Sequence, residues 1–233
     1  MLHLVSATRL SRERFMRESL LGKCLPRIGE YEQVGLTLFA ENQRPIGVCY
    51  NEVIDSAAPD DILVFVHDDV YIDDWFLNAR LTDALNHFDV IGVAGNQRLQ
   101  PNQEAWHLEP GSSLRDPNNL RRDTAYLSGA VAHGASPASA SLTKFGPSPS
   151  RVAVLDGVFL ATRALSLNET KVRFDPALGF HFYDLDFCRS ATQAGLRLGT
   201  WPIALTHQSR GESIFSQAWS DSLDAYLDKW RNP

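Results

Sequence analysis

The chain has 233 residues, 44% of them hydrophobic and 21% charged, which is the composition of an ordinary globular protein rather than a disordered or fibrous one. Its length suits one large α/β domain or two small ones. The formal net charge of −6 provides no basic footprint for duplex nucleic acid, so no nucleic-acid partner is expected.

The three cysteines, Cys24, Cys49 and Cys188, are odd in number and show no metal-ligand spacing such as C-x-x-C. We expect reduced thiols. The N-terminus lacks a charged segment followed by a long apolar one, and no window approaches the roughly 18 apolar residues of a membrane span. These features predict a cytoplasmic protein without a transmembrane segment, and they leave peripheral membrane contact open.

The first hundred residues alternate apolar runs with helix-compatible stretches. This alternation is typical of right-handed βαβ units, which build a parallel sheet with helices on both faces. The sequence therefore predicts an α/β fold with a Rossmann-type nucleotide-binding half. The expected strands are 2–5, 34–39, 62–66 and 90–94, and the expected helices run to about Leu21, from Gly47 to Ala58 and from Asp74 to about His87.

The third predicted strand, residues 62–66, is apolar at every position, as expected of a strand buried on both faces of a sheet. It is followed directly by His67, Asp68 and Asp69. Because ligands bind outside the carboxyl ends of strands in open α/β sheets, these polar residues stand where chemistry usually occurs. The alternative is that the two aspartates begin a turn or cap the next helix.

Between residues 99 and 150 the pattern dissolves into Pro, Gly, Ser, Ala and Asn. Long, weakly structured insertions in a compact domain are usually functional or mobile. We expect an irregular flap that faces the acceptor, with short strands around Ala130 to His133. A merely tolerated surface loop is the alternative.

Regular structure is predicted to resume after residue 150. Two apolar runs, 152–155 and 158–161, flank Asp156 and Gly157, where the glycine indicates a bend or a close approach of the backbone to a ligand. A helix is expected from Tyr183 to near Gly195, and a strand over 198–205 that ends before His207. The last segment has apolar residues at helical spacing, which predicts an amphipathic helix. Its apolar, mostly aromatic stripe should pack in the core or at a subunit contact, and consists of Phe215, Trp219, Leu223, Tyr226, Leu227 and Trp230.

Taken in chain order, the acidic cluster after the third strand, Asp156–Gly157, Asp184 at a helix start and His207 resemble the GT-A fold glycosyltransferases of family 2. The resemblance covers most of the chain except the insertion. The chain is most similar to a small bacterial subset of this family in which the strand-end motif is Phe-Val-His-x-Asp-Val, here residues 65–70.

This resemblance implies a single GT-A domain over residues 1–233. Its nucleotide-binding half would be residues 1–98, with a mostly parallel central sheet flanked by helices. Residues 99–150 would be the insertion, and 151–233 the acceptor and catalytic half with the C-terminal helix.

The resemblance also implies a metal-dependent, inverting transfer of a sugar from a nucleotide diphosphate donor, UDP-linked, to an unknown acceptor. A divalent cation with oxygen ligands stabilises a diphosphate leaving group. Asp69 matches the last carboxylate of the family's Asp-x-Asp motif, and His207 matches a late histidine ligand. This set suits Mn²⁺ (or Mg²⁺), and the imidazole favours manganese over calcium. His67 replaces the first Asp of the motif, and with Asp156 and Gly157 it is assigned to the sugar and acceptor pocket.

For the nucleotide, the resemblance implies a site formed by the loops after the first two strands, where oxygens can accept the imide N–H of a uracil. Asp68 would bind the ribose, or the metal through water. The alternative is that all of these are solvated loop residues, or for Asn51 a surface residue of a helix. The implied nucleotide-binding residues are Ser6, Thr8, Arg9, Glu41, Asn42, Asn51 and Asp68.

The implied catalytic base is Asp184, which aligns with the Asp of the family's Glu-Asp pair and would take the proton of the acceptor hydroxyl. Tyr183 replaces the preceding Glu. Asp186 is a rival, but on a helix the two aspartates diverge by about 200°, so that one of them faces the cleft. Helix capping is the alternative role of Asp184.

Two other functions are compatible with parts of the sequence. A sugar-nucleotide-binding protein of the same fold without turnover would fit the departures at His67 and Tyr183. A sugar-phosphate nucleotidyltransferase would share the nucleotide-binding architecture, but it should carry a Gly-rich, basic phosphate loop after the first strand. Residues 6–10 contain no glycine, which disfavours this function.

Overall fold

The computed structural model describes residues 1–100, 102–209 and 216–231. The strands are β1 (Leu2–Ala7), β2 (Val34–Phe39), β3 (Ile62–Val66), β4 (Val70–Ile72), β5 (Val90–Gly92), β6 (Ala94–Asn96), β7 (Leu127–His133), β8 (Ser141–Gly146), β9 (Ser150–Val152), β10 (Val154–Leu155), β11 (Phe159–Arg163), β12 (Leu198–Thr200) and β13 (Leu205–His207). The α-helices are α1 (Arg12–Glu18), α2 (Leu20–Tyr31), α3 (Ile46–Ser56), α4 (Leu77–His87), α5 (Ala164–Thr170), α6 (Tyr183–Gln193) and α7 (Gln217–Arg231).

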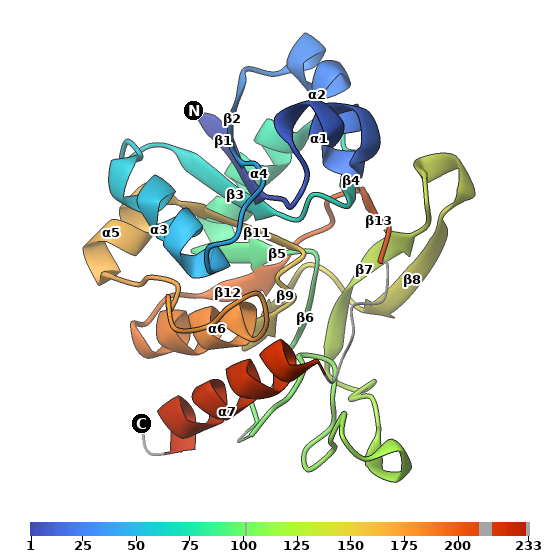
Figure 1. Cartoon of the computed structure of the whole chain (residues 1–233), viewed down its shortest axis with the longest axis vertical. Helices are drawn as coiled ribbons and strands as arrows, with labels where there is room; N and C mark the ends of the chain where they lie inside the picture. The colour runs from blue at the N-terminus through green and yellow to red at the C-terminus, as the bar shows by residue number, and fades with distance from the viewer. Residues whose placement is uncertain (101, 210–215, 232–233) are drawn as a thin grey trace.

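Two sheets organise the molecule (Figure 1). The main sheet has the order β2-β1-β3-β11-β5-β12-β9, and the second has the order β10-β6-β7-β13-β4, with β8 paired to β7. Strands β1, β2 and β3 are parallel, and every residue of β3 is buried, as its continuous apolar run predicted. The predicted βαβ arrangement of the first half of the chain is therefore present.

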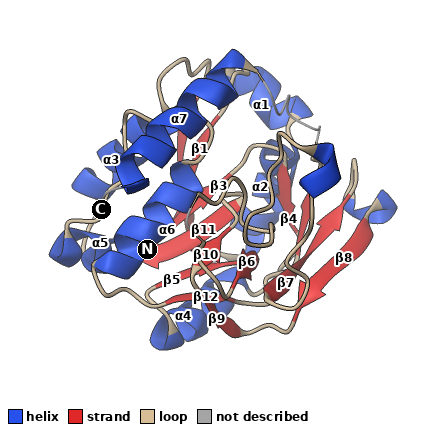
Figure 2. Cartoon of the chain, turned by 90° about the horizontal axis from the view of Figure 1, so that it is seen from below, coloured by secondary structure: helices blue, strands red, loops and turns tan. Residues whose placement is uncertain are grey.

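The main sheet is mixed, because β11 from the second half of the chain lies antiparallel between β3 and β5. Strand β12 is parallel to β5 and antiparallel to β9. Helices cover both faces, with α3, α5 and α6 on one and α4 on the other (Figures 1 and 2). An aromatic cluster joins α3 and α6 to the sheet: Tyr50, Phe65, Phe174, Tyr183 and Phe187.

Two predicted strands are each divided between the two sheets. The expected strand over 90–94 bends at Val93, so that β5 belongs to the main sheet and β6 to the second. The expected strand over 198–205 breaks after Thr200, where Pro202 cannot donate to a ladder, and resumes as β13 in the second sheet. These bends carry the chain from the main sheet to the second sheet, whose strands β4, β10 and β13 adjoin the site residues Asp69, Asp156 and His207.

The insertion is more regular than the sequence predicted. Its first part contains the short helical turn Pro117–Asn119, but its second part is a hairpin of β7 and β8 that projects from the body (Figure 1). The strands near 130–133 are confirmed and extend over all of β7. The sequence did not predict the hairpin because β8 is partly exposed and carries no clear strand pattern. Its hydrogen-bonded pairing with β7 makes it a strand.

Near both ends of the chain, the helices show features that the sequence did not specify. The first helix was expected to end near Leu21, yet the chain forms α1 and then α2, which the Ser19 side chain caps and which continues through Pro26 to Tyr31. The C-terminal stripe packs in the core through Trp219, Leu223 and Tyr226, and Phe215 lies outside the described residues. None of the described helices is long and apolar enough to cross a membrane.

Candidate active site

Strand pairing brings the end of β3 beside a segment that lies far away in the sequence. The chain leaves β3 at Val66, passes through His67, Asp68 and Asp69, and enters β4. Strand β13 pairs antiparallel with β4, so that His207 lies opposite Val70, and the backbone N–H of Gln208 donates to the Asp69 carbonyl at 2.9 Å. The register of this ladder therefore places the late histidine next to the acidic cluster.

His67, Asp69 and His207 form one cluster of possible metal ligands, because each offers one ligand atom within 4.8 Å of the others. Oδ1 of Asp69 lies 3.3 Å from Nε2 of His207. That oxygen is buried, and apart from this contact with His207 it makes no regular hydrogen bond among the described residues. A buried carboxylate oxygen with a free lone pair between two imidazoles fits a divalent cation such as Mn²⁺. The structure thus groups His67 with the two predicted ligands, whereas the sequence assigned it to the sugar and acceptor pocket.

The electrostatics of the cluster reflect this proximity. Burial lowers the pKa of His67, which favours the neutral ring. Burial opposes the charge of His207, but contact with the Asp69 carboxylate outweighs it and raises the pKa of His207. The same contact lowers the pKa of Asp69 against the opposing effect of burial. The contact therefore favours the charged forms of both groups, the carboxylate of Asp69 and the imidazolium of His207.

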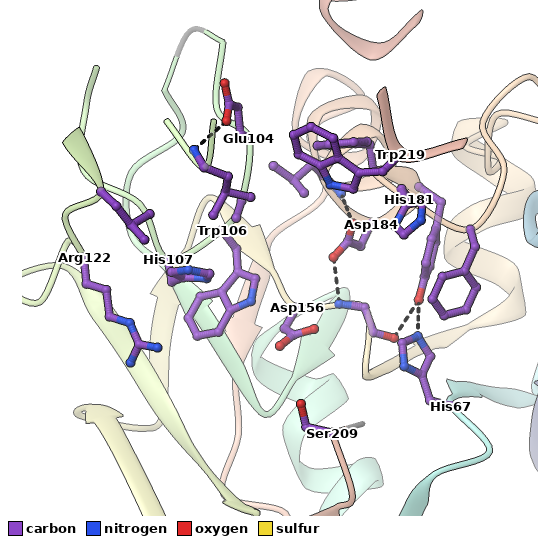
Figure 3. Close-up of a pocket in the computed structure, with 18 residues that line it drawn as sticks. His67, Glu104, Trp106, His107, Arg122, Asp156, His181, Asp184, Ser209 and Trp219 are labelled. Atoms are coloured by element: carbon purple, nitrogen blue, oxygen red, sulfur yellow. Dashed lines mark hydrogen bonds between the residues drawn. The ribbon is translucent and has the colours of Figure 1, made fainter. Parts of the chain in front are cut away.

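A cavity of about 580 Å³ opens beside the cluster and contains four of the predicted site residues: His67, Asp156, Gly157 and Asp184. In Figure 3, Asp156 and Asp184 lie between Trp106 on one side and His67 on the other. A pocket of this size with a few convergent polar groups is typical of a ligand site.

Asp184 is placed at this cavity by the first turn of α6. Its Oδ2 accepts from the backbone N–H of Gly157 at 3.0 Å, and its Oδ1 from that of Leu185 at 2.9 Å. The N-cap of α6 is Phe182, so Asp184 is not the capping residue. Burial, together with the negative charge of Asp156, raises the pKa of Asp184 to about 7. A carboxylate with a pKa near neutrality is suited to general-base catalysis.

Tyr183 connects the two sides of the site. Its hydroxyl lies 2.8 Å from Nε2 of His67 and 2.9 Å from the carbonyl oxygen of Gly157 (Figure 3). Gly157 is required for this contact, since a Cβ at that position would lie 2.4 Å from the Tyr183 hydroxyl oxygen. The glycine that the sequence associated with a close backbone approach therefore approaches a side chain of the same site.

On the other side of the acidic cluster, the loops after β1 and β2 lie side by side. The Thr8 hydroxyl donates to the Asp68 carboxylate, and the backbone N–H of Asn42 donates to the Thr8 carbonyl at 2.9 Å. The hydroxyl of Ser6 is buried and has no hydrogen-bond partner among the described residues. Thus Thr8, Asn42 and Asp68 come together, with Ser6 in the adjoining strand β1 and Glu41 beside Asn42, and their nucleotide binding stays a prediction.

Three predicted residues have other surroundings. The Asn51 amide is engaged on both sides by the backbone of Phe174, at 2.8 and 3.0 Å, so its structural role is to anchor that segment to α3. The Asn42 side chain bonds the backbone of Arg44 within its own turn. Arg9 is exposed. Asp186, the rival base, is fully buried and faces α7, where it contacts Lys229 and Trp230 at 2.8 Å.

The sequence did not identify the residues of the far wall of the cavity. Trp106, His107 and Arg122 come from the irregular part of the insertion, and Trp219 comes from α7. No periodicity or motif marks Trp106, His107 or Arg122, and the tertiary fold alone brings them to the site. Trp219 was recognised as an aromatic stripe residue, but its contribution to the cavity was not.

Comparison with known proteins agrees with this architecture. The model of the glycosyltransferase-like family matches residues 30–222. A mannosyltransferase from Pyrobaculum calidifontis in complex with GDP-Man and Mn²⁺ is similar in fold, with a TM-score of 0.50, 14% identity and coverage of 91% of this chain and 58% of that chain. GalNAc-T7 with UDP, GalNAc and Mn²⁺ is also similar, with a TM-score of 0.57, 12% identity and coverage of 97% and 47%.

At these identities the likeness concerns the fold, and this chain spans about half the length of those two chains. No curated protein matches it. The family match nevertheless extends over most of the chain and includes β3, the acidic cluster, Asp184 and His207. We conclude that the chain has the GT-A fold and belongs to the glycosyltransferase-like family.

Proposed function

We propose that this protein is a metal-dependent, inverting glycosyltransferase that transfers a sugar from a UDP-sugar to an acceptor. The observation that carries the proposal is the position of Asp184, a base with a pKa near 7, in the same cavity as His67 of the ligand cluster. A base and a cation site on one cavity are what a displacement at the anomeric carbon of a nucleotide-sugar requires.

His67, Asp69 and His207 are the residues that would hold the cation. A bound divalent cation supplies positive charge to the donor diphosphate, whose negative charge grows as the glycosidic bond breaks. Two imidazoles and one carboxylate suit Mn²⁺ better than Mg²⁺. Both similar structures contain Mn²⁺ together with nucleotide or nucleotide-sugar ligands, which supports the same choice here.

Asp184 would accept the proton of the attacking acceptor hydroxyl. Its two hydrogen bonds to backbone N–H groups fix the carboxyl group, and burial together with the charge of Asp156 raises its pKa to about 7, so that at neutral pH about half of the molecules carry the ionised form that can take the proton. Inversion follows if the acceptor enters from the side of Asp184 while the diphosphate leaves on the side of Asp69.

The nucleotide would lie over the loops after β1 and β2. Asp68, held by Thr8, is positioned to accept hydrogen bonds from ribose hydroxyls, and the orphan hydroxyl of Ser6 offers a further polar contact. Glu41 is exposed in the neighbouring loop and supplies the carboxylate that can accept a uracil imide N–H. We do not assign Asn51 to this site, because its amide group is already engaged.

In this assignment the whole chain works as one GT-A domain, with residues 1–98 on the nucleotide side and 151–233 on the catalytic side. The insertion, through Trp106 and Arg122, contributes the wall of the cavity opposite His67, which is the side from which an acceptor would enter.

The test is calorimetric titration of the protein with UDP, with and without Mn²⁺, followed by a donor-hydrolysis assay over a panel of UDP-sugars. We expect Mn²⁺-dependent UDP binding and turnover of at least one donor. UDP binding by the wild type without turnover of any donor would instead indicate a binding protein of the same fold. Absence of any nucleotide binding would overturn both functions.

A further inference from the structure

The positions at which this sequence departs from the family motifs, His67 and Tyr183, touch each other in the folded chain. Nε2 of His67 and the hydroxyl oxygen of Tyr183 are 2.8 Å apart although the two residues belong to different halves of the chain. The Tyr183 side chain is buried, with 3% of the residue exposed, so solvent does not compete for its hydroxyl group. The contact therefore acts inside the site, and its direction can be worked out from its second partner.

That second partner is the carbonyl oxygen of Gly157, at 2.9 Å. A carbonyl oxygen can only accept, so the single hydroxyl proton of Tyr183 is donated to Gly157. The Tyr183 oxygen is then left as an acceptor toward His67. Nε2 of His67 must consequently carry a proton, and in the neutral ring Nδ1 is the nitrogen with the free lone pair.

Packing holds the Tyr183 ring in the position that this chain of hydrogen bonds needs. Its centroid lies 6.1 Å from that of Tyr50 and 6.0 Å from that of Phe174, in the aromatic cluster between α3 and α6. Gly157 leaves the space for its hydroxyl, as described above. On the other face of the site, His67 is bracketed by Phe180, whose ring centroid is 5.3 Å away. Neither ring can turn without disturbing these contacts.

We propose that Tyr183 is a positioning residue that holds His67 as its Nε2–H tautomer, so that Nδ1 is the atom this ring offers to the divalent cation. The proposal rests on the metal site of the proposed function. Outer partners of metal-binding histidines fix the tautomer and the ring orientation in this way, and their loss typically weakens metal affinity by about 10- to 100-fold. The Tyr183 hydroxyl acts through His67, since its proton is donated to Gly157 and its oxygen accepts from the His67 ring.

The first experiment needs no metal. The ¹⁵N signals of histidine-labelled protein are recorded by long-range ¹H–¹⁵N NMR at pH 8, and those of His67 are identified by their loss in His67→Gln. We expect a protonated Nε2 and an unprotonated Nδ1 in the wild type, and a shift toward a mixture of the two tautomers in Tyr183→Phe. A wild-type ring protonated at Nδ1, or equally mixed, overturns the proposal.

The second experiment measures Mn²⁺ affinity, from the EPR signal of the free ion, in the folded variants. Tyr183→Phe keeps the ring and removes one hydroxyl, and we expect its Kd for Mn²⁺ to rise at least about tenfold. Tyr50→Phe is the matched control, because Tyr50 lies in the same cluster and its buried hydroxyl has no hydrogen-bond partner among the described residues. Its affinity should equal that of the wild type.

The outcomes separate this inference from the proposed function. If Tyr183→Phe binds Mn²⁺ as tightly as the wild type and retains its fold by circular dichroism, the positioning role is wrong and the metal site stands. If the wild type binds no Mn²⁺ but shows the Nε2–H tautomer, the hydrogen bonds from His67 through Tyr183 to Gly157 are confirmed and the metal-dependent function fails. The positioning role toward a cation is then rejected as well.

Discussion

Oδ1 of Asp69 and Nε2 of His207 lie 3.3 Å apart, although these residues come from different halves of the chain. The antiparallel pairing of β4 with β13 produces this proximity, and the carboxylate raises the pKa of the histidine. A metal ion needs the neutral imidazole and must compete with the proton that this ion pair retains. The relationship therefore makes metal binding depend on pH.

We expect Mn²⁺ to bind more tightly as the pH rises from 6 to 8, with a change in Kd of about tenfold per pH unit in the range where His207 loses its proton. Thermal unfolding in a dilution series of Mn²⁺ measures this, because a ligand that binds the folded state alone raises Tm. Asp69→Asn should abolish the Mn²⁺-dependent rise. Asp83→Asn, an exposed aspartate on α4, should leave it intact. An equal rise in both variants would place the cation elsewhere.

Asp184→Asn and Asp186→Asn distinguish the two candidate bases. We expect Asp184→Asn to lower kcat by about 10²- to 10⁴-fold with unchanged affinity for UDP and Mn²⁺, because a general base contributes to the chemical step alone. Asp186 faces Lys229 and Trp230 of α7, so Asp186→Asn should lower Tm but leave kcat per folded molecule within about threefold. Steady-state kinetics and calorimetric affinities, measured on both variants, show which aspartate is the base. A large loss of kcat in Asp186→Asn, with kcat retained in Asp184→Asn, would exchange the two roles.

The raised pKa of Asp184 also has a consequence for stability. The folded carboxyl group keeps its proton up to about pH 7, whereas the unfolded one loses it near its ordinary value of 3.8. The folded state therefore binds the extra proton between these values, and the contribution of Asp184 to stability falls as the pH rises through this window. Above pH 7 the buried charge is a net cost.

Asp184→Asn removes this cost, so we expect the variant to exceed the wild type in Tm by about 2 °C or more at pH 8, and by less at pH 5. Differential scanning calorimetry at both pH values checks it. A difference in Tm that is independent of pH would mean that Asp184 has an ordinary pKa in the folded protein.

Gly157→Ala tests the close packing at the centre of the site. The added Cβ would lie 2.4 Å from the Tyr183 hydroxyl oxygen and 2.9 Å from Cβ of Asp184, so both side chains must shift. We expect a loss of stability of about 1–3 kcal/mol and a fall in kcat of at least about tenfold.

Gly29→Ala is the control for this prediction, because nothing lies within 4 Å of a Cβ at that position of α2. It should leave kcat unchanged and stabilise the helix slightly. Chemical denaturation and steady-state rates on both variants decide the outcome. Wild-type activity in Gly157→Ala would show that the site tolerates displacement of Tyr183 and Asp184.

The local pattern of the sequence predicted the strands that carry the site and the polar residues at their ends. Strands β1, β2 and β3 are apolar runs that end in polar loops, and such runs bury themselves in a sheet whatever follows them. The same pattern placed Asp69 directly after β3, whereas Asp184, at the start of α6, became a candidate through the family resemblance.

Other features depend on pairings that no local pattern encodes. The insertion of β11 between β3 and β5 and the pairing of β4 with β13 are set by contacts between distant segments, which strand propensity does not specify. The grouping of His67 with Asp69 and His207 follows from that second pairing.

By itself, the sequence therefore determined the α/β class and the family resemblance, and it pointed to the carboxyl end of β3 as the candidate functional edge and to Asp184 as the candidate base. The tertiary structure decided which histidines join Asp69, that Tyr183 bridges His67 to Gly157, and that Trp106 and Arg122 of the insertion complete the cavity. The physical reason is that burial and periodicity are properties of short segments, whereas a site is a set of contacts between segments, and those exist only after the chain has folded.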